Sequence, residues 1–178
     1  DKVTVTYQPQ SAGTHPAVLT VKAGEEATAT VNLTGKAVQA LEGTWILVTD
    51  ASSLKAGDEI IIAAKESDVA LSTTQAGNNR PEVAITKNDN TITATSETQV
   101  LTLQAGNKEN TLALYTGDGY LYAASSTNNY LRTETTLSDN SSWSIAVAAD
   151  GTATLTAQGT YTRNTIFYNQ SSKLFACY

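Results

Sequence analysis

Residues that commonly carry chemistry are scarce in this sequence, since its 178 residues include one cysteine, one histidine and no methionine. The single cysteine, Cys177, cannot form a disulfide within the chain, and no histidine lies near it to activate its thiol. The single histidine, His15, cannot complete a catalytic triad or a histidine-rich metal site. We therefore interpret Cys177 as a buried structural residue and His15 as a solvated turn residue, and we expect no metal and no cofactor.

Charge is also sparse, and it is mostly negative. Charged residues make up 16% of the chain, with 17 acidic and 11 basic residues and a net charge of −6. Nucleic-acid binding relies on clustered lysine and arginine, so we exclude nucleic acid as a partner. No apolar run approaches the ~18 residues of a membrane-spanning helix, and we expect no membrane insertion. Because the first residue is Asp1 and the last residues are apolar, we expect a processed or excised piece of a longer protein, with any targeting signal outside the chain.

Short alternating segments separated by turn residues fill the chain, and no helical period extends beyond ~10 residues. Residues 1–37 predict strands at 3–7, 17–21 and 27–33, and residues 38–43 are the expected linker. Residues 44–178 form the second predicted domain. Its twelve predicted strands fall into three groups of four: 45–49, 59–64, 69–73 and 82–86; then 100–104, 111–115, 120–123 and 130–133; then 143–147, 152–156, 165–169 and 173–177.

Each group opens with a large apolar residue and a second one two positions later, as in Trp45-x-Leu47, Leu101-x-Leu103 and Trp143-x-Ile145. The first group is longer because a polar stretch, residues 86–97, adds a loop and a small strand at 91–93. Three blades cannot close a propeller, whereas three four-stranded units fit a twelve-stranded β-trefoil. A β-sandwich is the alternative. We interpret Trp45 and Trp143 as core residues of the barrel.

The stretch from 111 to 132, TLALYTGDGYLYAASSTNNYLR, is the centre of this pattern. Leu112 and Leu114 alternate with less apolar neighbours, as in a strand. Asp118-Gly119 predicts a hairpin with a type I′ turn, which needs positive φ at both central residues.

Three segments carry resemblances to known families. Residues 1–37, with VTVTY-x-P-x-x-AGTH, AVLTVKAG and ATATVNLTGKA, resemble the last strands of a bacterial immunoglobulin-like domain. The Tyr-Leu steps at 120 and 130 are similar to those of fascin-like and ricin-like trefoils. Residues 44–178, through WILVTDASSLKAGDEIIIAA, GYLYAASSTNNYLRT and RNTIFYNQSSKLFACY, resemble uncharacterised modules that follow immunoglobulin-like domains in secreted proteins of gut anaerobes. The expected fold is therefore all-β, with a β-trefoil-like domain after a partial immunoglobulin-like segment.

Catalysis has little support in the sequence. A glycosidase needs two converging carboxylates, but the aspartates at 58, 118, 139 and 150 all lie in turns, where aspartate is expected for backbone reasons. Asn88-Asp89-Asn90 lacks the glycine and terminal glutamate of a calcium loop. The Gln-x-Trp pattern of ricin-type sugar sites is absent. We therefore expect no enzyme activity, and a glycoside hydrolase is the least favoured alternative.

Aromatic residues give the one indication of a binding site. Six of the eight tyrosines lie between positions 115 and 168, and asparagine and arginine are interleaved with them. Alternation places Leu121 and Leu131 in the core and their neighbours on the opposite face. The predicted site comprises Tyr120, Tyr122, Asn128, Asn129, Tyr130 and Arg132. The alternative is that these tyrosines simply line a half-buried sheet.

These residues favour a noncatalytic accessory module that binds carbohydrate or matrix glycan within a larger secreted protein, because aromatic rings stack on sugars while amides and guanidinium groups bind hydroxyls. A structural or adhesion module with a protein partner is the alternative. The strands of residues 1–37 are expected to pack on the barrel or to pair with a second copy, because unpaired edges invite aggregation.

Overall fold

The protein is all-β. The computed structural model describes residues 13–23, 27–37 and 44–178, so the strand predicted at 3–7 and the linker at 38–43 lie outside the described residues. The chain divides into two compact units, Asp1–Glu42 and Gly43–Tyr178. In the described part the only helices are two three-residue 3-10 turns, η1 (Ala51–Ser53) and η2 (Asp139–Ser141). No helix there is long and apolar enough to cross a membrane.

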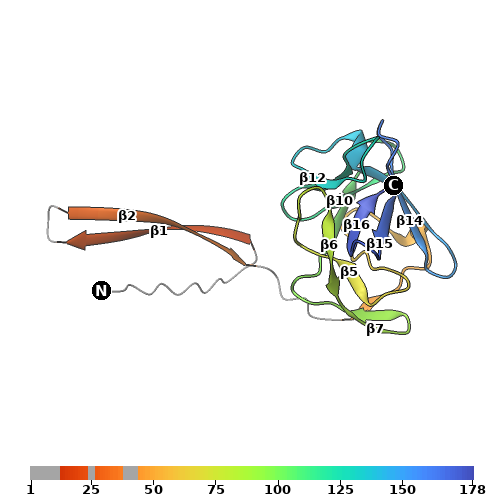
Figure 1. The fold of residues 1–178 in the computed structure, drawn as a ribbon, viewed down its shortest axis with the longest axis horizontal. Coiled ribbons are helices and arrows are strands. Elements are labelled where there is room, and N and C mark those ends of the chain that lie inside the picture. Colours follow the sequence, from red (N-terminus) through yellow and green to blue (C-terminus); the bar gives the residue numbers. More distant parts are fainter. Residues whose placement is uncertain (1–12, 24–26, 38–43) are drawn as a thin grey trace. The chain divides into compact units, whose positions relative to one another are not determined.

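The first unit contains an antiparallel ribbon of β1 (Gly13–Ala23) and β2 (Ala27–Ala37) (Figure 1). Its register places Ala17, Leu19 and Val21 opposite Leu33, Val31 and Ala29, so these six residues share one face. His15 belongs to β1, so the prediction that it lies in a turn is wrong. The second strand of the ribbon extends beyond the predicted end at residue 33, because residues 34–37 continue the antiparallel pairing with residues 13–16.

The second unit contains fourteen strands. They are β3 (Trp45–Ile46), β4 (Glu59–Ile60), β5 (Val69–Leu71), β6 (Arg80–Ala84), β7 (Thr86–Asn88), β8 (Thr91–Thr93), β9 (Leu101–Ala105), β10 (Leu112–Tyr115), β11 (Tyr120–Ala123), β12 (Leu131–Glu134), β13 (Ser142–Val147), β14 (Ala153–Ala157), β15 (Ile166–Asn169) and β16 (Leu174–Cys177).

Each of the twelve strands predicted in this unit overlaps a strand of the structure, and the small strand at 91–93 is β8. The polar stretch from 86 to 97 holds more structure than predicted, because β7 and β8 form a hairpin that pairs with β3. Threonine-rich segments form strands readily when a partner supplies their hydrogen bonds.

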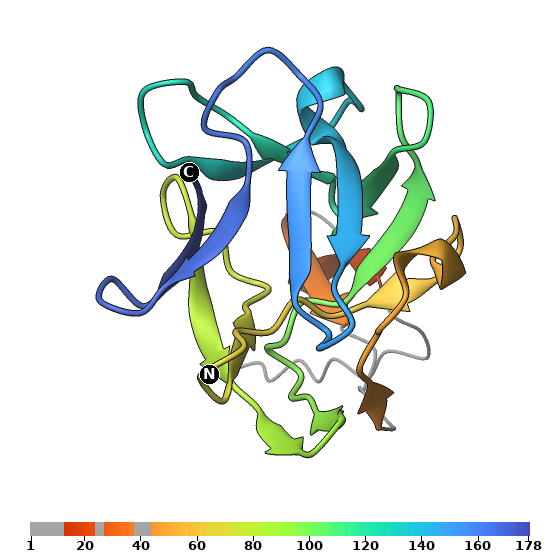
Figure 2. The ribbon, with the colours of Figure 1, turned by 90° about the vertical axis from the view of Figure 1, so that its right-hand side faces the viewer.

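Antiparallel pairings join the three predicted groups to one another. β4 of the first group pairs with β9 of the second, and β10 of the second pairs with β13 of the third. β16 of the third group pairs with β6 of the first. β4 and the strands from β9 to β14 form one seven-stranded sheet that curls around the core of the unit (Figure 2).

The main core lies inside this curl. Its fully buried members include Leu101, Leu103, Leu121, Leu131 and Trp143. The Trp143 indole Nε1 donates a 3.0 Å hydrogen bond to the Leu121 carbonyl. The one polar atom of this buried ring therefore has a hydrogen-bond partner. Trp143 is therefore a core residue, as predicted.

The prediction for Trp45 is wrong, because this residue is only half-buried on the small sheet of β3, β8 and β7. Its neighbour Ile46 is 76% exposed. Alternation alone did not distinguish a strand of a small sheet with one open face from a strand that packs on the main core.

The predicted hairpin between β10 and β11 is present, but its type I′ turn is not. Tyr115 pairs with Tyr120, and the Thr116 N–H donates to the Gly119 carbonyl at 2.8 Å, so Gly117 and Asp118 form the two-residue loop. Of these residues only Gly117 has positive φ, at +97°. Glycine at the first central position is the pattern of a type II′ turn.

Candidate functional site

The outer face of β11 and β12 carries the predicted aromatic residues. In β11, Leu121 and Ala123 are buried while Tyr120 and Tyr122 are half-buried on the opposite side. Leu131 at the start of β12 is fully buried and Arg132 is exposed. The alternation predicted for Leu121 and Leu131 is thus confirmed.

The register between these strands brings the predicted residues together. Tyr122 lies directly opposite Arg132, and Tyr120 lies opposite Glu134. The Ala124 N–H donates to the Tyr130 carbonyl at 3.1 Å, which extends the pairing by one step and puts half-buried Tyr130 next in line. Residues directly opposite in an antiparallel pair share a face. We call the surface formed by Tyr120, Tyr122, Tyr130 and Arg132 the tyrosine face.

The tyrosine face continues onto β10 through Tyr115, which the sequence singled out only as one of the six clustered tyrosines. The Tyr115 and Tyr120 ring centroids are 5.2 Å apart at 54°. The Tyr120 hydroxyl donates to Gln104 Oε1 at 3.1 Å, and the Tyr115 hydroxyl donates to the Gly117 carbonyl at 2.8 Å. These bonds fix both rings. Within the described residues, Arg132 forms no ion pair.

The two predicted asparagines differ from each other. Asn129 Oδ1 accepts a 2.5 Å hydrogen bond from Arg163 Nη1, so this amide is engaged within the protein. Asn128 is exposed, and its Nδ2 donates to Thr127 Oγ1 at 3.2 Å. Of the pair, Asn128 is therefore the exposed residue, in the loop that joins β11 to β12.

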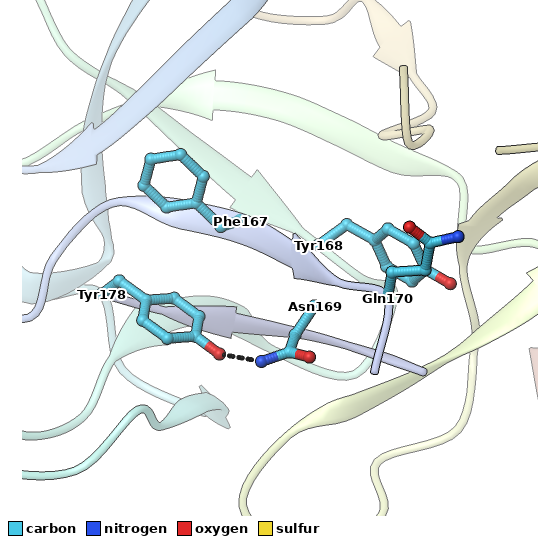
Figure 3. Close-up of a pocket in the computed structure, with 5 residues that line it drawn as sticks. All are labelled: Phe167, Tyr168, Asn169, Gln170 and Tyr178. Carbon is cyan, nitrogen blue, oxygen red and sulfur yellow. Dashed lines mark hydrogen bonds between the residues drawn. The ribbon is translucent and has the colours of Figure 1, made fainter. Parts of the chain in front are cut away.

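A second aromatic surface, which sequence reasoning missed, lies on the β15–β16 hairpin. Phe167, Tyr168, Asn169, Gln170 and Tyr178 line a shallow depression of about 490 Å³ (Figure 3). None of the six predicted site residues lines it. Its main signal in the sequence is the segment Ile166-Phe167-Tyr168, but three consecutive apolar residues do not show which of them faces outward.

Ring contacts and hydrogen bonds hold the side chains of the hairpin depression. Phe167 is 55% exposed, and its ring meets the Tyr178 ring edge-to-face, with centroids 6.1 Å apart and planes at 84°. Asn169 Nδ2 donates to the Tyr178 hydroxyl at 2.6 Å. Tyr168 also lines the depression, and its ring packs on buried Phe175 while its hydroxyl donates to Glu82. That hydrogen bond raises the pKa of Tyr168 to about 12.

A smaller depression of about 340 Å³ lies between η1 and β10. Its lining combines polar residues, Ser52, Asn110 and Thr111, with aliphatic residues and the buried Trp143. Its lining contains no charged side chain and shares no residue with the tyrosine face or the hairpin depression.

Two buried groups could have carried chemistry, and both have structural surroundings. Burial raises the pKa of the Cys177 thiol to about 12, so the nucleophilic thiolate is suppressed at neutral pH. Burial lowers the pKa of Arg80 to about 10, which leaves its guanidinium charged at neutral pH. The Arg80 guanidinium donates to the carbonyls of Ser72 and Thr73 and to the side chains of Gln99 and Thr133.

Carboxylates on the second unit hold the loops together. Asp150 pairs with Lys65 at 2.8 Å, and Asp139 pairs with Lys108 at 3.2 Å. Glu134 accepts hydrogen bonds from Ser138 and Ser141 beside η2. The described residues contain no group of three or more histidine, cysteine or acidic side chains that could hold a metal ion.

Comparison with known proteins gives no relative: no protein family, no curated protein and no solved structure matches the chain.

Proposed function

We propose that this chain is a noncatalytic, extracellular accessory module that binds carbohydrate or matrix glycan within a larger secreted or cell-surface bacterial protein. The observation that carries the proposal is the tyrosine face. There, Tyr120, Tyr122 and Tyr130 are half-buried on the side of the sheet away from Leu121 and Leu131, with Arg132 directly opposite Tyr122.

This surface combines the groups that a sugar needs. A half-buried tyrosine presents an aromatic face that can cover the apolar C–H face of a pyranose. The Arg132 guanidinium supplies donors for hydroxyl or carboxylate oxygens, and Asn128 adds an amide at the edge of the surface. Because hydrogen bonds to Gln104 and Gly117 hold two of the rings, little conformational entropy is lost when a ligand binds.

The surroundings of the titratable groups support a noncatalytic role. Asp139, Asp150 and Glu134 have partners that tie loops together, and burial raises the pKa of Cys177. A glycosidase would need two carboxylates converging on an open site, and the tyrosine face itself contributes only Glu134 at its margin.

We propose further that the second unit is a β-trefoil. Equivalent strands make equivalent contacts: the second strand of one group pairs with the first strand of the next in both β4·β9 and β10·β13. The third such contact would join β14 to β3, and there a Cβ on Gly151, just before β14, would lie 2.6 Å from Leu47, just after β3. An experimental structure that superposes on itself by threefold rotation would test this arrangement.

A protein-binding adhesion module is the second candidate, and the β1–β2 ribbon favours it. Val21 and Val31 are exposed on the ribbon's apolar face, and the ribbon has no third strand among the described residues. Light scattering tests this candidate, because a clean monomer would exclude pairing of the ribbon with a second copy.

A glycan array probed with the 178-residue chain tests the leading proposal, followed by titration of any hit with Tyr122→Ala. Loss of a stacking ring weakens binding by roughly 1–3 kcal/mol, by analogy with base stacking, and leaves the melting temperature nearly unchanged. Leu121→Ala is the matched control, since it empties a core position in the same strand and costs about 2–5 kcal/mol of stability.

An array without a hit above background would remove the proposal. The site would also be ruled out if Tyr122→Ala and Tyr130→Ala both unfolded the domain, because the rings would then be core residues.

A further inference from the structure

The hairpin depression on β15 and β16 has no part in the tyrosine face. From its geometry we propose that it is a second saccharide-binding site, which accepts one neutral hexopyranose ring. Three features of the depression favour such a ligand: two aromatic rings at right angles, a tyrosine hydroxyl whose proton is available, and side chains without formal charge.

The corner is formed by Phe167 and Tyr178. Phe167 is 55% exposed, and the planes of the two rings meet at 84°. In this edge-to-face arrangement a ring face stays open to a ligand, whereas parallel stacking would cover one face of each ring. Figure 3 shows the Phe167 ring on β15 and the Tyr178 ring, which directly follows β16, near each other. An uncovered ring face favours the flat C–H face of a pyranose, as aromatic platforms favour other planar ligands.

The Tyr178 hydroxyl is oriented by Asn169. The Ser172 backbone N–H can only donate, and it lies 2.9 Å from Asn169 Oδ1. This contact fixes the amide, so Nδ2 must be the atom that donates to the Tyr178 hydroxyl at 2.6 Å. The Tyr178 oxygen therefore accepts from Asn169, and its own proton remains available to a ligand hydroxyl. Asn169 is a positioning residue, because it acts through Tyr178.

The chemistry of the lining selects a neutral ligand. None of the five lining side chains is a carboxylate, lysine, arginine or histidine, so an ionic ligand would lose hydration without a side-chain counter-charge. The exposed Gln170 amide offers a donor and an acceptor at the rim. The volume of about 490 Å³ lies within the ~300–1,000 Å³ range of small-molecule sites.

A protein partner fits this surface less well. A stable protein interface buries about 800 Å² on each side, and in this hairpin Phe167 is the one large hydrophobic residue that is strongly exposed. A single ring with adjacent polar groups suits a monosaccharide unit better than a protein surface.

The experiment is an NMR titration of the 178-residue, ¹⁵N-labelled protein with methyl β-D-glucopyranoside and methyl β-D-galactopyranoside, each to about 100 mM. Sorbitol is the control ligand, since it has similar hydroxyl groups but no ring face. We expect at least one glycoside, and not sorbitol, to shift the amide signals of residues 167–170 and 178, with a millimolar dissociation constant typical of one small contact.

Two variants assign the contacts. Phe167→Ala should weaken binding at this site at least about tenfold, and its exposure means that the fold is retained. Tyr178→Phe keeps the ring and removes the hydroxyl, and it should weaken binding roughly three- to tenfold. Tyr122→Ala should leave the shifts at residues 167–170 unchanged, so failure of the tyrosine face and failure of this site give different results.

Three outcomes would overturn the proposal. The first is the absence of shifts at residues 167–170 with either glycoside. The second is an equal response to sorbitol. The third is broadening of these same amides with protein concentration alone, which would identify the hairpin as a contact between protein surfaces.

Discussion

At the scale of single residues, Arg80 links three separate segments of the second unit. It is 4% exposed, and its guanidinium joins the segment after β5 to Gln99 and to Thr133 of β12. Its Nε atom has no hydrogen-bond partner in the described structure. A charge this deeply buried is tolerated because four acceptors replace most of its hydration.

Replacement of Arg80 by methionine should therefore be costly. The substitution leaves two carbonyls and two side chains without the hydrogen-bond donor that the guanidinium supplied. We expect the free energy of unfolding to fall by about 3 kcal/mol. Denaturant titration measures the effect. Arg132→Met is the matched control, and its exposed position predicts a change within about 0.5 kcal/mol. Equal losses in the two variants would contradict this role for Arg80.

Cys177 provides a prediction about alkaline pH. Burial raises the folded-state pKa of its thiol from 9.0 to about 12, so the unfolded chain loses this proton first. The thiol's contribution to stability is then complete below about pH 9 and is lost as the pH rises towards 12. Cys177→Ala should show a shallower alkaline decline in the free energy of unfolding than the parent protein. Indistinguishable slopes would mean that the thiol is not shielded as described.

A direct check uses a thiol reagent at pH 8. The native protein should react at least about a hundred times more slowly than the protein in denaturant, because thiolate formation and access are both suppressed.

At the scale of elements, the β10–β11 hairpin shows why its glycines are needed. Gly117 supplies the positive φ of the turn, but Gly119 is required by a close approach. A Cβ at position 119 would lie 2.4 Å from the Glu134 carbonyl oxygen and 2.9 Å from Thr133 Cγ2. β12 therefore runs too close to the turn for any side chain there.

Gly119→Ala should lower the free energy of unfolding by about 3 kcal/mol, at the upper end of overpacking costs, because backbone of β12 would have to move. Gly77→Ala is the control, since Gly77 has a φ of +61° and open space around its Cα. Its expected loss is about 1 kcal/mol, the cost of a left-handed alanine. Chemical denaturation measures the free energy of unfolding of both variants. Similar losses would show that the backbone of β12 moves at little cost to make room for the Cβ.

At the scale of the whole molecule, the two units differ in their means of stabilisation. Every residue of the two hydrophobic clusters lies in Gly43–Tyr178. The β1–β2 ribbon has two strands and an apolar face that is largely exposed within its own unit. Two-stranded ribbons of this kind are marginally stable in water unless something covers that face.

Residues 43–178 produced alone should therefore fold with the stability of this unit in the full chain. We expect the denaturant midpoint and its slope to match the main transition of the 178-residue protein, because no core residue is removed. A midpoint corresponding to a loss of more than about 1 kcal/mol would show that residues 1–42 contribute to the core of the second unit.

Local sequence determined the strands of this protein. Alternation and turn residues act over a few positions, so they located all twelve predicted strands of the second unit and the buried side of β11 and β12. The same reasoning gave Leu121 and Leu131 as core residues, since each is the strongest aliphatic residue in its short strand. Cys177 was interpreted as buried for a different reason, because no histidine lies near it in the sequence to activate its thiol.

Tertiary structure decided which strands meet, and with that it decided everything that depends on long-range neighbours. Trp45 and Trp143 open their groups in the same way, yet only Trp143 lies in the main core, because β3 pairs with the β7–β8 hairpin in a separate small sheet. Gly119 and Arg80 owe their roles to β12, which follows Gly119 closely in sequence but lies more than fifty residues from Arg80. The hairpin depression likewise depends on which of Phe167 and Tyr168 faces the core. A period of two cannot choose between adjacent aromatic residues, and only the packing of Tyr168 on Phe175 does so.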